Sequence, residues 1–156
     1  PGNWAFALQN NPGFFGSYNV VIPGDNFGYP QPLVTAGQLG GTGSILALQT
    51  LSDGFGRKTP AEQLSALYLA AQISIQHDLP FGYGRLNGLR LGCQLVPPDD
   101  KLLPREFRTL TTGVTLTESS NMQDLFDATN AALKSNDPTD IAELLRIYRL
   151  LRACGI

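Results

Sequence analysis

Three stretches of this chain repeat apolar residues at helical spacing, and each begins like a helix. Residues 59–78 open with Thr59 as N-cap, Pro60 in the first helical position and Glu62 as the capping-box partner. Leucine, isoleucine and alanine then fall on most faces, which predicts the central helix of the core. We expect this helix to end shortly before Pro80, because proline disfavours helical backbone at the preceding residue.

Two more helices are predicted near the carboxyl end, one over residues 120–135 and one that begins at Asp137 and stops at Gly155. Ser120 and Gln123 have the spacing of a capping box, and Asp137-Pro138 supplies an N-cap and a first helical residue. Only a turn separates these helices, so we expect them to pack as an antiparallel pair. The second has a broad apolar face made by Ile141, Leu144, Leu145, Tyr148, Leu150 and Leu151.

The amino-terminal part has a different pattern, with turn signals from glycine, proline and asparagine. Alternation favours short strands at Trp4–Leu8 and Tyr18–Ile22. We therefore expect residues 1–40 to form an extended, irregular arm, lying either on the protein's own core or on a neighbour. The apolar run at 43–52 predicts a short helix after it.

The middle of the chain predicts β structure. Asn87-Gly88 separates two alternating runs, which favours a β-hairpin over residues 81–95. The Thr-rich segment 107–116 is a candidate strand, with Gly113 as a kink. The predicted fold is α+β and a single domain over residues 1–156. A small helical core of about four helices with the hairpin would occupy residues 41–156, after the arm.

Charge is the unusual feature of the composition. Only 15% of the 156 residues are charged, against about 25% in an ordinary soluble domain, and the net charge is −2. This balance excludes a globally basic nucleic-acid-binding protein, although a local basic patch stays possible. It fits either a surface covered by other chains or one of neutral polar residues. No apolar run reaches 18 residues, so no membrane span is expected.

Candidate catalytic groups are few, and each has a structural interpretation. His77 is the only histidine and falls at a helix carboxyl end, where the dipole favours a cation. The acid pairs Asp99-Asp100 and Asp124/Asp127 fall in a turn and in the first turns of a helix. The glycine-rich segment 40–44 lacks the lysine of a phosphate-binding loop. We expect no cofactor, no metal and free thiols at the two cysteines, Cys93 and Cys154.

The predicted hairpin gives the sharpest hypothesis for a binding site. It places Arg85 opposite Arg90, beside the aromatic residues Phe81 and Tyr83. Such a surface suits nucleic acid or a protein partner, although acids or solvent can also neutralise the pair. Candidate anion or nucleic-acid contacts are Arg85, Arg90, Arg105 and Arg108. Candidate interface residues are Phe81, Tyr83, Trp4, Tyr18 and Tyr29.

The leading functional hypothesis is a self-assembling structural subunit, such as a viral coat, filament or scaffold-like protein. The low-charge arm would make the subunit contacts, and a homo-oligomer is expected. One alternative is an accessory or linker subunit of a larger hetero-complex. The other is a small enzyme with a site near His77 or near Pro1, whose secondary amine is a base when it is the free terminus.

Overall fold

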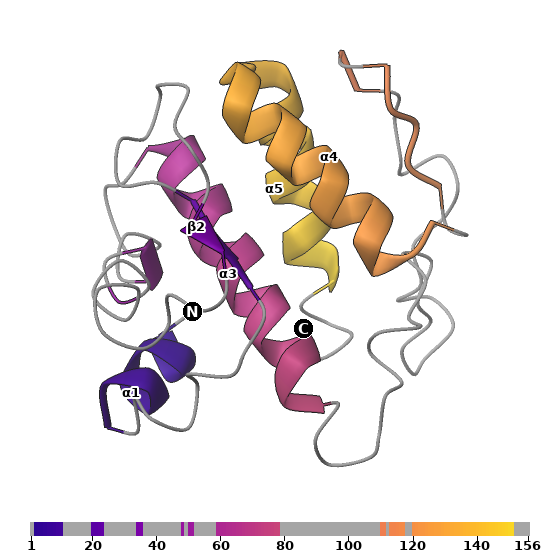
Figure 1. Ribbon diagram of the computed structural model, residues 1–156. Helices are drawn as coiled ribbons and strands as arrows, with labels where there is room; N and C mark the ends of the chain where they lie inside the picture. The colour runs from indigo at the N-terminus through magenta and orange to yellow at the C-terminus, as the bar shows by residue number, and fades with distance from the viewer. Residues whose placement is uncertain are drawn as a thin grey trace.

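A computed structural model describes the protein over a large part of its sequence. The described residues are 2–10, 20–23, 34–35, 48, 50–51, 59–78, 110–111, 113–117 and 120–151. They are mostly helical (Figure 1). Four helices are described from end to end: α1 (Gly2–Asn10), α3 (Pro60–Asp78), α4 (Met122–Ser135) and α5 (Pro138–Leu151). The predicted hairpin at 81–95 lies outside the described residues.

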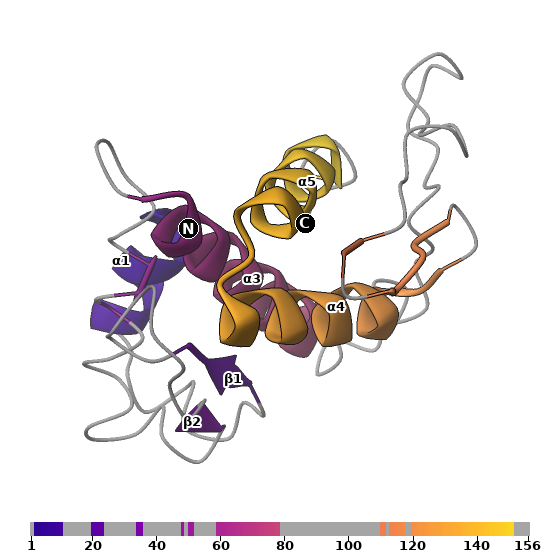
Figure 2. The same ribbon diagram turned by 90° about the horizontal axis from the view of Figure 1, so that it is seen from above.

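Helix α3 is the centre of the described core, as its apolar sequence predicts. Leu64, Tyr68 and Ile75 belong to a cluster shared with α4 and α5. Leu69 and Ile73 belong to a second cluster, shared with α1 and strand β1 (Val21–Ile22). Figures 1 and 2 show α1 on one side of α3 and the α4–α5 pair on the other. A helix covered on two sides needs apolar residues around most of its circumference.

The start of α3 confirms the predicted cap. The Glu62 backbone N–H donates to Thr59 Oγ1 at 3.2 Å, and the Thr59 hydroxyl donates to Glu62 Oε1 at 3.0 Å. Pro60 is the first helical residue. Thr59 thus satisfies a backbone donor that the helix cannot pair internally.

The start of α4 corrects the predicted cap by one residue. Asn121, not Ser120, is the N-cap. Asn121 Oδ1 accepts from the Asp124 backbone N–H at 2.9 Å, and Asp124 Oδ2 accepts from the Asn121 N–H at 3.0 Å. Asparagine caps as well as serine, and an acid at the third position completes the reciprocal pair. Ser120 Oγ instead accepts from the Thr117 N–H at 2.9 Å.

The predicted strand at Trp4–Leu8 is wrong, because this segment lies inside helix α1. In a strand, residues 4, 6 and 8 would share one face. The structure instead buries Leu8, leaves Trp4 partly buried and exposes Phe6. Trp4 and Leu8 are four residues apart and so share one helical face, which packs in the cluster with α3. The alternation of large and small apolar residues is compatible with a strand, but packing against α3 favours the helix.

Strand β1 falls within the predicted strand at Tyr18–Ile22. It pairs antiparallel with β2 (Val34–Thr35), with Ile22 opposite Val34. The backbone of Val21 is held by a side chain of α3: its N–H donates to Gln72 Oε1 at 2.6 Å, and Gln72 Nε2 donates to its carbonyl at 2.8 Å. The amide of Gln72 thus pairs with β1 as the backbone of another strand would.

In its described part, the predicted strand at 107–116 is wrong except at Thr115, which forms an isolated β-bridge. Residues 110, 111, 113 and 114 belong to a tight turn, in which the Leu110 N–H donates to the Val114 carbonyl at 2.8 Å and the Gly113 N–H to the Leu110 carbonyl at 2.9 Å. Gly113 has φ 86°, a left-handed conformation that glycine adopts without strain. The kink predicted at Gly113 is confirmed, and it reverses the chain.

Two other expectations are met by described residues. Residues 48, 50 and 51 are helical, within the short helix predicted over 43–52. Among the described helices, none is both long enough and apolar enough to cross a membrane.

Candidate binding groove

Most of the predicted site residues lie outside the described part of the chain, so their roles stay predictions. These are Phe81, Tyr83, Arg85, Arg90, Arg105, Arg108, Tyr18 and Tyr29. Trp4 is described, and its indole Nε1 donates to Ser74 Oγ at 2.9 Å. This contact fastens α1 to α3 within one chain.

The candidate catalytic groups that the structure describes are His77, Asp124 and Asp127, and all three belong to helices. The backbone of His77 belongs to the last turn of α3, as predicted. Asp124 caps α4, and Asp127 Oδ1 accepts from Gln123 Nε2 at 2.9 Å. Within the described residues, histidine, cysteine, aspartate and glutamate form no group of three that could hold a metal ion. Further candidates lie outside the described residues: Pro1, segment 40–44, Asp99, Asp100, Cys93 and Cys154.

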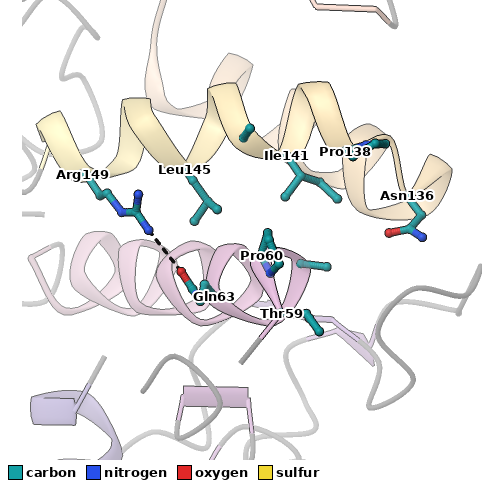
Figure 3. Close-up of a pocket in the computed structure, with 10 residues that line it drawn as sticks. Thr59, Pro60, Gln63, Asn136, Pro138, Ile141, Leu145 and Arg149 are labelled. Carbon is teal, nitrogen blue, oxygen red and sulfur yellow. Dashed lines mark hydrogen bonds between the residues drawn. The ribbon is translucent and has the colours of Figure 1, made fainter. Parts of the chain in front are cut away.

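The structure shows a groove that sequence analysis missed, between the start of α3 and the length of α5 (Figure 3). Its volume is about 560 Å³, within the range of pockets that bind ligands. The lining residues are Thr59, Pro60, Ala61, Gln63, Asn136, Pro138, Ile141, Ala142, Leu145 and Arg149. No local pattern predicts such a groove, because it depends on how two helices distant in the sequence pack together.

The groove has apolar walls and polar ends. Pro60 lies on the α3 side, and Ile141 and Leu145 point from α5 into the space between the helices (Figure 3). At one end Arg149 Nη2 donates to Gln63 Oε1 at 3.1 Å, which links the two helices. Arg149 carries the only charge among the residues that line this groove. The groove is therefore suited to an apolar side chain with neutral or weakly negative surroundings.

The helix starts beside the groove are already capped by the protein's own side chains. Asp137 Oδ1 accepts from the backbone N–H groups of Thr139 at 2.9 Å and of Asp140 at 3.0 Å, and Asp137 Oδ2 accepts from the Thr111 hydroxyl at 2.8 Å. The Asp140 N–H, followed by the Thr111 hydroxyl, lowers the pKa of Asp137. With Thr59 capping α3 in the same way, these helix starts do not favour a bound anion.

A second hollow, of about 580 Å³, adjoins the groove at Pro138 and Ala142, which line both, and is more polar. Glu143 and Arg146 on its wall form an ion pair at 2.6 Å. The buried carboxylate of Asp140 accepts from the Thr111 backbone N–H at 2.7 Å. The Asp140 contact joins Thr111 to α5, and the ion pair lies within α5, so we assign this hollow a structural role.

Two buried tyrosines connect the helices of the larger cluster. The Thr129 hydroxyl donates to the Leu125 carbonyl at 2.7 Å, so at the 2.9 Å contact with Tyr148 it is the tyrosine hydroxyl that donates. Tyr68 Oη donates to Asn130 Oδ1 at 2.9 Å. Burial raises the pKa of both tyrosines. Both hydroxyls therefore stay protonated at neutral pH and act as hydrogen-bond donors.

Phe6 is the most exposed large apolar side chain among the described residues. Its side chain is 71% exposed, and the next, Val114, is 37% exposed. Gln9 and Asn10 are also exposed and lie three and four positions further on, so they share the outer face of α1 with Phe6. The Asn10 side chain donates to the Phe6 carbonyl at 2.8 Å.

Comparison of the chain with protein-family models, with curated proteins and with solved structures finds no match.

Proposed function

We propose that this protein is a self-assembling structural subunit whose low-charge amino-terminal segment makes the subunit contact. The observation that carries the proposal is Phe6, a large aromatic side chain held in solvent on a fixed helix. Aromatic residues, phenylalanine among them, are enriched at protein interfaces relative to the rest of the surface. Coat, filament and scaffold-like proteins all belong to the class proposed.

The way in which α1 is fixed strengthens this argument. Leu8 is buried against the core, and Trp4 donates its hydrogen bond to Ser74 of α3. Phe6 lies between these two attachments, so the helix backbone is already ordered before any partner binds. A preorganised anchor loses less conformational freedom on association, which leaves more of its burial energy for binding.

Composition supports the same proposal from another direction. Charged residues make up 15% of the chain, and α1 contains none. A surface with few charges keeps copies apart less effectively and loses less solvation when it is covered. The property that makes such a surface poorly soluble when exposed favours its burial in an assembly.

The experiment is the mass of the full chain in solution by light scattering, over a range of concentrations. We expect a species larger than the 16.8 kDa monomer, and a shift to monomer in Phe6→Asp. Thr139→Asp is the matched control, because it adds the same charge to an exposed position on α5, away from α1, without removing an aromatic ring. A wild-type chain that is monomeric at every concentration would contradict self-assembly, and would favour a subunit of a hetero-complex.

A further inference from the structure

We infer that the α3–α5 groove of one copy receives Phe6 of a second copy, so that subunits associate head to tail. This inference rests on the proposed function, since it names the two surfaces through which self-association occurs. The described residues contain both halves of such a contact: an aromatic ring in solvent, and a hollow with apolar walls.

Geometry prevents a copy from filling its own groove with its own Phe6. On α3, the groove lies at Thr59–Gln63, whereas α1 is attached at Ser74, three helical turns or roughly 16 Å further along. The side of α3 that bears α1 also faces away from α5 (Figures 1 and 2). With α1 fixed at Trp4 and Leu8, the ring is presented outward, and its partner groove must belong to another molecule.

The two surfaces are complementary in polarity and charge. The outer face of α1 presents Phe6 with the neutral amides Gln9 and Asn10, and these match apolar walls with polar ends. Arg149 is the only charged residue that lines the groove, and it donates to the neutral amide of Gln63. The carboxyl end of α1 carries the negative end of the helix dipole, with no basic residue in its last turn. This end is a suitable neighbour for Arg149.

A contact of this kind joins two different patches and is therefore heterologous. Each copy keeps one unused Phe6 or one unused groove after pairing, so association continues until a ring closes or a filament forms. A symmetric dimer made by two equal patches would stop at two copies. The two cases make different predictions for mixtures of variants.

The test uses one variant for each surface and measures mass by light scattering. Phe6→Asp removes the ring, and Ala142→Glu places a charge on an exposed wall of the groove, where glutamate keeps the helix and has Arg146 four residues on. Thr139→Glu is the control for the second variant, because it adds the same charge to α5 outside the groove. Circular dichroism verifies that every variant retains its helices.

We expect each variant alone to be monomeric, with the association concentration raised at least roughly tenfold, while Thr139→Glu assembles like the wild type. An equimolar mixture of Phe6→Asp and Ala142→Glu should form a dimer and nothing larger, because one copy supplies the groove and the other supplies the ring. If the wild type and Ala142→Glu assemble equally, the groove is not the partner of Phe6, and the inference fails while self-assembly stands. A monomeric wild type would contradict both the inference and self-assembly.

Discussion

The elements on the two sides of helix α3 are fixed by different kinds of contact, local in the sequence on one side and distant on the other. On one side, α4 and α5 begin at caps made by their own neighbouring residues, Asn121 with Asp124 and Asp137 with Asp140. On the other, α1 and β1 are held by side chains of α3 about 50 to 70 residues away in the sequence: Gln72 on the backbone of Val21 and Ser74 on the indole of Trp4. The first side forms from local signals, and the second depends on α3 being in place.

This difference explains which elements could be predicted from the sequence. The starts of α3 and α5 follow from Thr59-Pro60 and Asp137-Pro138, and the error at the start of α4 is one residue, between two good capping residues. At Trp4–Leu8 the apolar alternation permits a strand or a helix, and only packing against α3 selects the helix. A local sequence pattern cannot predict an element whose conformation depends on a contact with residues distant in the sequence.

The features of the candidate site also depend on contacts between elements that are distant in the sequence. Trp4 was predicted as an interface residue because it is aromatic, but the exposed aromatic ring on the same helix is that of Phe6. The distinction depends on which face of α1 meets α3. The groove could not be predicted, since it requires the relative positions of Pro60 and Leu145. Placing Pro60 and Pro138 at first helical positions was correct, but it does not show that both residues line one groove.

The largest expected effect is on the free energy of unfolding, when the same substitution is made on each side of α3. Leu144 and Leu8 are 0% and 1% exposed, in the α4–α5 cluster and the α1 cluster respectively. We expect Leu144→Ala to lower the free energy of unfolding by about 2–5 kcal/mol. Leu8→Ala should cost less, because α1 can detach while the other helices stay folded. Urea denaturation and hydrogen exchange of α1 measure the two effects, and equal losses with one cooperative transition would contradict the distinction.

A smaller effect is expected from Gln72, which fixes β1 to α3. Gln72→Met keeps the length of the side chain but removes both hydrogen bonds to the backbone of Val21. We expect a loss of about 2 kcal/mol in the free energy of unfolding, because two backbone groups in a partly buried site lose their partner. Gln123→Met is the control, since Gln123 is exposed on α4. Equal stabilities of the two variants would show that β1 does not need this contact.

The smallest effect is a pH dependence confined to the α5 side. The pKa of Asp137 is lowered in the folded protein, mainly by the Asp140 N–H. A lowered folded-state pKa stabilises the protein above the unfolded value of about 3.9, and this stability is lost as the pH falls through the folded value. Asp137→Asn can still cap the helix but does not titrate there. Its unfolding free energy should fall less than that of the wild type between pH 7 and pH 3, measured by urea denaturation; equal losses would exclude Asp137 as a source.

The most direct test of the account is the identity of the residues that Phe6 contacts in the assembled protein. Phe6 is replaced by the photoreactive analogue p-benzoylphenylalanine, and the products are mapped by mass spectrometry after irradiation. Mixing with an isotope-labelled copy distinguishes links between molecules from links within one. The account predicts intermolecular links to the groove, on residues 59–63 or 136–149. Links that are only intramolecular, or that fall on another surface of the partner copy, would contradict it.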